Sequence, residues 1–140
     1  MKRGDVLRSL ISGVHADHSG YQALRRLLDE QFDAALRHDA KELAVLGTRI
    51  STQVAALDES RRERMKLVAL LGLRAPVSME HVIALFANTT RDAVSQLWQA
   101  LEALVVECKA LNTRNCWLMM EQHAMMQRVL DGEADTYVPT

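Results

Sequence analysis

Two histidines, His15 and His18, come closest in type and spacing to a metal site. On a helix, residues three positions apart share one face, so the two imidazoles, with Asp17 nearby, could hold a metal ion together. The sequence implies no third ligand, and the Glu-x-x-His pairs of di-iron bundles are absent. We therefore expect surface histidines and no metal centre.

The same histidines allow a second chemistry, which is histidine phosphotransfer. Proteins of that class are also small helical bundles with one exposed histidine. The stretch from His15 to Gly20 lacks the basic residue and the small-residue spacing that would steady a phosphoryl group. Phosphotransfer stays open as an alternative.

The two cysteines, Cys108 and Cys116, lie eight residues apart in one predicted helix. Their Cα atoms would be roughly 12 Å apart at 1.5 Å per residue, beyond the roughly 7 Å that a disulfide spans. We therefore expect two reduced thiols, as in a reducing compartment. There is no Gly-rich phosphate loop and no Ser/His/Asp set, so the sequence predicts no enzyme activity and no cofactor.

The composition favours a single all-α domain. The chain has 140 residues, of which 49% are apolar and 25% charged, and it has only two prolines and six glycines. These are too few prolines and glycines for the many turns of an all-β fold. A net charge of −1 creates no field that attracts nucleic acid. No apolar run approaches the roughly 18 residues of a membrane span. We expect a cytoplasmic protein that binds neither nucleic acid nor membrane.

Apolar periodicity and helix-end residues predict four helices, at about 5–38, 39–71, 79–87 and 91–130. Asp39 with Glu42, and Ser78, are N-terminal caps, and Gly72 is a C-terminal stop. Gly20 predicts a bend or fraying before Tyr21. The fourth helix repeats apolar residues every three or four positions over five heptads, which is typical of coiled-coil-like packing.

Three long helices and one short one, joined by short connections, predict an elongated antiparallel helical bundle. We expect one helical domain over residues 1–132, ended by Asp131-Gly132, and a polar C-terminal tail over residues 133–140. A basic cluster over residues 61–66 is interpreted as a solvated helix face.

The end of the fourth predicted helix carries apolar side chains on two sides. One side groups around Leu118, and we expect it to face the other helices. At about 100° per residue it includes Leu111, Met125 and Val129, with Met119 and Met126 on its flank. The other side, about 100–160° away, includes Trp117, Met120 and Ala124.

Methionines are concentrated on this helix end, where four of the seven lie within eight residues. Methionine is flexible and adapts to apolar partners of varied shape. One helix of so small a bundle cannot be surrounded on all sides, so we expect the second apolar side to bind another protein.

One run in this helix also resembles a known signature. It reads Leu111-Asn112-Thr113-Arg114-Asn115-Cys116-Trp117-Leu118. This is similar to the Leu-Asn-x-x-Asn-Gly-x-Leu signature of FlgN-type flagellar export chaperones, except that Cys116 replaces the usual glycine. The stretches Leu27-Leu28-Asp29-Glu30 and Trp98-Gln99-Ala100-Leu101 are also similar to that family.

The resemblance implies a cytosolic type III export chaperone. Its clients would be the hook-associated proteins of the hook–filament junction, bound through their C-terminal amphipathic helices and delivered to the flagellar export apparatus. We expect the partner-binding residues to be Leu111, Asn112, Asn115, Trp117, Met119, Met120 and Met126. A structural or oligomerising coiled-coil module would use the same apolar stripes on itself, so self-association stays open.

Overall fold

The computed structural model describes residues 2–136, and the side chains of residues 2–132. Within this range the chain forms four α-helices and no strand. They are α1 (Arg3–Leu36), α2 (Ala40–Leu70), α3 (Met79–Ile83) and α4 (Asn88–Thr136). The predicted all-α bundle of three long helices and one short one is confirmed.

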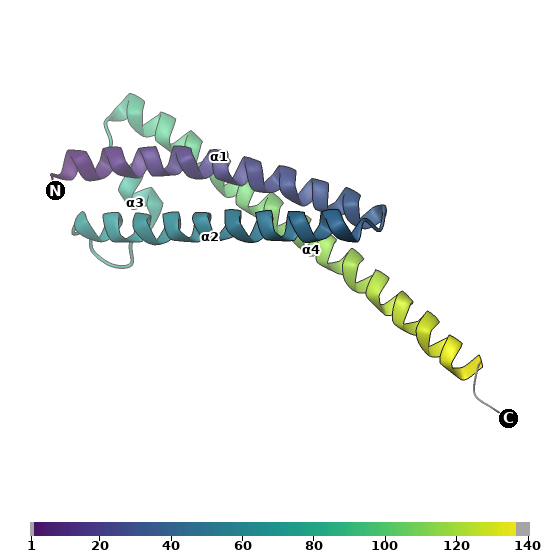
Figure 1. Cartoon of the computed structure of the whole chain (residues 1–140). Coiled ribbons are helices and arrows are strands. Elements are labelled where there is room, and N and C mark those ends of the chain that lie inside the picture. The colour runs from purple at the N-terminus through teal and green to yellow at the C-terminus, as the bar shows by residue number, and fades with distance from the viewer. Residues whose placement is uncertain (1, 137–140) are drawn as a thin grey trace.

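The central helix of the bundle is α1. It forms an antiparallel hairpin with α2, and α4 crosses this hairpin and continues well past its end (Figure 1). Both α2 and α4 pack along α1, whereas α2 and α4 form no extended interface with each other in the described part of the chain. Two helices are therefore held side by side through a third.

The helix ends follow the predicted capping residues in part. The Asp39 carboxylate accepts a hydrogen bond from the Glu42 backbone N–H at 3.1 Å, as the capping prediction requires. Gly72, two residues after the end of α2, has a φ of 66°, a left-handed conformation suited to glycine. The Ser78 N–H donates to His81 Nδ1 at 3.3 Å and begins α3. That helix ends at Ile83, four residues before the predicted end.

The predicted end of the fourth helix is wrong, because α4 continues through Asp131-Gly132 to Thr136. A single glycine in a helix costs only about 1 kcal/mol, which the residues on both sides of Gly132 can offset. The remaining residues of the predicted polar tail, 137–140, lie outside the described range.

A cluster of buried side chains joins the three long helices. Leu24 and Leu28 from α1 pack with Leu57 from α2 and Cys108 from α4. Apolar side chains are removed from water most completely where all three helices contribute, so this cluster stabilises the crossing. It follows the apolar stripes that the sequence predicts.

Gly20 lies where α1 and α2 approach closely. A Cβ atom at this position would stand 2.9 Å from Leu57 Cδ2, too close for unadjusted packing. The Gln53 side chain donates to the Gly20 carbonyl at 3.0 Å. Instead of the predicted bend or fraying, α1 is continuous here, and the glycine permits the contact with α2.

A polar link connects the helices near the same crossing. Asp17, at an inward position of α1, is buried, and its carboxylate lies 2.6 Å from Arg64 Nη1 of α2. The Arg64 guanidinium also lies over the Trp98 ring of α4, 5.3 Å from its centroid. The interpretation of residues 61–66 as a solvated face is therefore wrong for Arg64, which touches all three long helices.

Two amides fix α4 on α1. Asn115 is completely buried, and its amide donates to the Leu28 carbonyl at 2.7 Å and to Gln31 Oε1 at 2.9 Å. Two turns later, the Gln122 amide donates to the Ala35 carbonyl at 2.8 Å, in the last turn of α1, where carbonyls lack partners within the helix. These bonds set the position of α4 along α1.

The inward stripe of α4 ends with Gln122. Leu118 is only half-buried, and Met125 and Val129, which we expected to face the other helices, are exposed. The reason is that α1 ends at Leu36 and no longer covers this side of α4, which faces only the start of α2 across a cavity. The predicted side is right, but the side chains there stay exposed.

The buried amide gives a stability prediction. Asn115→Ala should lower the free energy of unfolding by about 1–3 kcal/mol, because it removes the hydrogen bonds of a buried amide and leaves the Leu28 carbonyl without this donor. Asn112→Ala is the matched control, since Asn112 is exposed on the same helix and should change stability by less than about 0.5 kcal/mol. Urea denaturation measures both. Equal losses would contradict the role of Asn115 as the fixing residue.

Candidate functional site

The predicted partner-binding residues occupy three different places on α4. Trp117 and Met120 lie on its outer face. Asn112, Met119 and Met126 lie on the side that faces α2. The third place is toward the core, where Leu111 is half-buried against the cluster around Leu24 and Leu28. Asn115 is buried against α1, so in this conformation it positions α4 and presents no surface.

The outer face of α4 exposes large apolar side chains. Trp117 is 66% exposed and Met120 is 70% exposed. Soluble proteins rarely leave such side chains together in water unless they mark an interaction surface. Met125, Met126, Val129 and Leu130 are also exposed, so apolar side chains surround the helix end.

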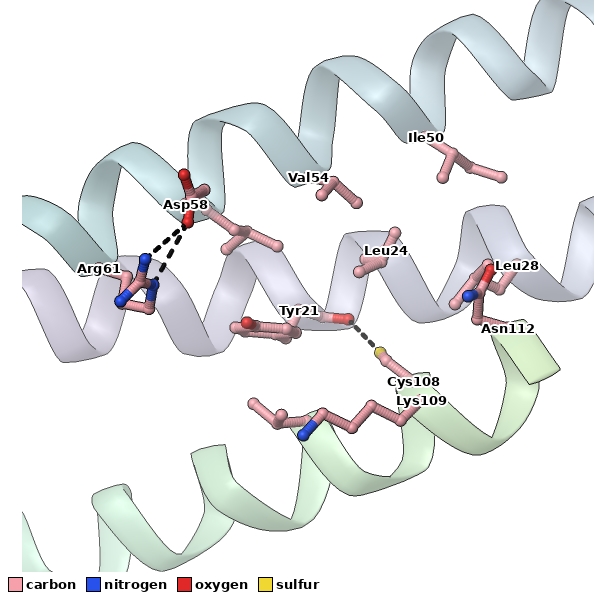
Figure 2. A pocket seen from close by; sticks show the side chains of 12 residues that line it. Tyr21, Leu24, Leu28, Ile50, Val54, Asp58, Arg61, Cys108, Lys109 and Asn112 are labelled. Atoms are coloured by element: carbon pink, nitrogen blue, oxygen red, sulfur yellow. Dashed lines mark hydrogen bonds and ion pairs between the residues drawn. The ribbon is translucent and has the colours of Figure 1, made fainter.

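A second apolar surface, which we call the α2–α4 furrow, lies between these two helices. Figure 2 shows α2 and α4 as its walls and α1 between them as its floor. Its cavity has a volume of about 290 Å³. The floor is made by Tyr21, Leu24 and Leu28, the α2 wall by Ile50, Val54, Leu57, Asp58 and Arg61, and the α4 wall by Val105, Cys108, Lys109 and Asn112.

A separate cavity lies beyond the end of α1. It has a volume of about 600 Å³ and lies between the start of α2 and the end of α4. Leu43 of α2 lines it opposite Met119 and Met126 of α4. On α2, Leu43 is two heptads before Leu57, and on α4, Met126 falls at the same helical angle as Cys108. The two cavities are therefore lined by the same face of each helix.

Two side chains that line the furrow, Cys108 and Tyr21, carry groups that could act as nucleophiles when ionised. Burial raises the pKa of the Cys108 thiol, and the Glu107 carboxylate raises it further. The thiol donates to the Tyr21 carbonyl at 3.6 Å. Burial also raises the pKa of the Tyr21 hydroxyl, followed by the effect of Asp17. Both groups are therefore neutral near pH 7, and Cys108 packs as an apolar side chain rather than acting as a nucleophile.

The histidines form no ligand set in the described residues. His15 is exposed and His18 half-buried, and the Asp17 carboxylate between them is bonded to Arg64. No group of three or more His, Cys, Asp or Glu side chains in residues 2–132 is arranged to hold a metal ion. A search of the described helices for one long and apolar enough to cross a membrane also finds none.

Sequence reasoning missed the α2 wall of the furrow. Ile50, Val54 and Leu57 follow one another at helical spacing in the sequence as one apolar stripe, and half of such a stripe can face an opening instead of the core. Val54 is 48% exposed. The available signal was the position of Arg61 on the same face, four residues after Leu57, because a charged residue in an apolar stripe indicates access to water.

The family-like stretches contact each other. Asn115 bonds to Leu28, and the neighbouring Arg114 lies 3.3 Å from the Asp29 carboxylate. The Arg114 guanidinium also stacks 3.8 Å from the centroid of the Phe32 ring. Leu27-Leu28-Asp29-Glu30 and the Asn-x-x-Asn run thus form one junction between α1 and α4. Within this run, Asn115 and Arg114 are the residues that hold α4 on α1.

At position 116, where the family usually has glycine, no neighbouring helix comes close enough to require a residue without a side chain. Cys116 is exposed, and its thiol faces the Asn112 side chain of its own helix, 3.9 Å from Oδ1. A side chain larger than hydrogen therefore fits here.

Comparison with known proteins supports the same family. The model of the FlgN protein family matches residues 1–132. No curated protein and no solved structure matches the chain, so the family model carries the assignment. A match that covers the helical bundle from α1 into the last part of α4 shows that this chain belongs to the FlgN family of flagellar export chaperones.

Proposed function

We propose that this protein is a cytoplasmic export chaperone for hook-associated proteins of the hook–filament junction. It binds the C-terminal amphipathic helices of these clients, prevents their premature assembly, and delivers them to the flagellar type III export apparatus. Family membership supports the general chaperone role, and the client and the delivery step are the parts proposed.

The observation that carries the proposal is the exposed apolar end of α4. An amphipathic helix that is separated from its partners in an assembly has an apolar stripe to cover. Trp117, Met119, Met120 and Met126 offer aromatic and flexible thioether side chains for such a stripe. Asn112 extends this surface into the furrow.

The interior of the bundle leaves this surface free to bind. Its hydrogen bonds and buried clusters lie between α1 and the other helices, and they do not use Trp117 or Met120. Partner binding can therefore change without loss of the fold. This separation distinguishes a binding face from a core face.

Self-association through the same side chains is the competing function. Two copies pairing through the ends of α4 would also cover Trp117 and Met120. A stable dimer that a client helix does not disrupt would favour a structural module over a chaperone.

The first prediction concerns complex formation. The full-length protein, mixed with the C-terminal segment of a hook-associated protein from the same source, should form a soluble complex that elutes as one species in size-exclusion chromatography. Isothermal titration calorimetry should show a negative heat-capacity change, because apolar surface is buried. Failure to bind any junction protein, together with clear binding of another class of protein, would overturn the proposed client.

The second prediction concerns the outer face. Trp117→Ala and Met120→Ala should each weaken binding of this segment by about 2 kcal/mol if they anchor the interface. Both should change the free energy of unfolding by less than about 0.5 kcal/mol, because the side chains are already exposed.

Val106→Ala is the control for these two variants. Val106 is 67% exposed and lies on the same face of α4, three turns before Trp117. It should affect neither affinity nor stability. Unchanged affinity in the Trp117 and Met120 variants would remove the outer face from the binding site.

A further inference from the structure

The α2–α4 furrow has the geometry of a bundle that lacks one helix. Four-helix bundles cover each helix with two neighbours around a common core. Here α1 has both of its neighbours, but α2 and α4 face each other across an opening. A helix placed in that opening would touch α1, α2 and α4 together (Figure 2).

We propose that the α2–α4 furrow is the seat of one client helix, and that this helix carries carboxylates at one defined end. The inference rests on the function proposed above and assigns the client a place, a length and a charge pattern. The exposed outer face of α4 then contacts the rest of the client segment.

The residues that line the furrow define the apolar part of the client helix. From Ile50 to Arg61 the α2 wall is about 17 Å long at 1.5 Å per residue, which accommodates about three turns of a helix. Val54 is half-exposed in the middle of this wall, and Val105 stands on the α4 wall. A stripe of apolar residues on the client would cover both.

The charges set the orientation. At the end of the furrow near Tyr21, Arg61 stands on α2 and Lys109 on α4, one on each wall (Figure 2). Asp58 is the one carboxylate among the residues lining this cavity, and it is already shared by Arg61 and Arg62 at 3.1 and 3.0 Å. Within the described side chains, Lys109 has no ion-pair partner.

This end of the furrow therefore has an excess of positive charge, whereas Asn112, toward the other end of the same cavity, is neutral. A client helix gains most when its acidic residues lie beside Arg61 and Lys109. A helix with basic residues at that end is disfavoured by like-charge repulsion, so the charges select both partner and direction.

Substitution of two valines, one in the furrow and one outside it, tests whether the client helix binds in the furrow. Val54→Asp should weaken binding of the C-terminal client segment at least about tenfold, because the carboxylate would be covered by an apolar helix without a partner. Val45→Asp is the control on the same helix. Val45 is 49% exposed, but it lies nine residues from Val54 and so faces the opposite way. The Val45→Asp variant should bind the segment as tightly as the unmodified protein does. Circular dichroism melting should show that both variants are folded.

Charge reversal tests the orientation. Lys109→Glu should slow association of the segment about threefold to tenfold at low salt, and the difference should shrink as salt rises. Lys66→Glu is the control, since Lys66 is exposed on the face of α2 opposite to Leu57. A segment whose acidic residues at one end are replaced by lysines should bind Lys109→Glu better than it binds the unmodified protein.

The outcomes separate this inference from the proposed function. If the segment binds the unmodified protein and both valine variants equally, the furrow is not its seat, although the chaperone function stands. If no segment binds the unmodified protein, both are overturned. If both valine variants fold and Val54→Asp alone dimerises less than the unmodified protein, the furrow binds a second copy of this chain. That outcome contradicts the furrow as the client's binding site.

Discussion

The whole arrangement depends on α1 being the one helix on which both α2 and α4 are packed. Leu24 and Leu28 supply apolar surface to both neighbours at once. Asn115 then fixes the position of α4 by its bonds to the carbonyl of Leu28 and to Gln31. Helices α2 and α4 contact each other at Arg64 and Trp98, but they are held mainly through α1, so an opening remains between them. The furrow and the exposed end of α4 both follow from this constraint.

The constraint also explains which parts of the fold the sequence could predict. The periodic stripe of α4 predicts its contacts correctly as far as Gln122, because periodicity reports which side of a helix is apolar. It does not report where a neighbouring helix ends, so the exposure of Met125 and Val129 could not be read from it. The partner of Asp17 is equally non-local, since Arg64 is 47 positions away in the chain.

The sequence also predicts one part of the candidate site and not the other. The outer residues Trp117 and Met120 followed from helix angles alone, and their exposure agrees with that prediction. The furrow requires two helices and a floor, so only a three-dimensional structure could show that Val54 and Val105 line the same opening. The signature residue Asn115 shows a further limit. A motif identifies a family, but here Asn115 of its Asn-x-x-Asn block is buried at a helix junction and fixes the position of the proposed binding surface.

The most direct test of this account is to map the bound client on the full-length protein by nuclear magnetic resonance. Backbone amide signals would be assigned with and without the C-terminal segment of a hook-associated protein. The account predicts that the largest shifts occur along the furrow, at Tyr21, Val54 and Val105, and continue to Met119, while α3 is unchanged. Shifts confined to α3, or to the α2 face around Val45, would contradict it.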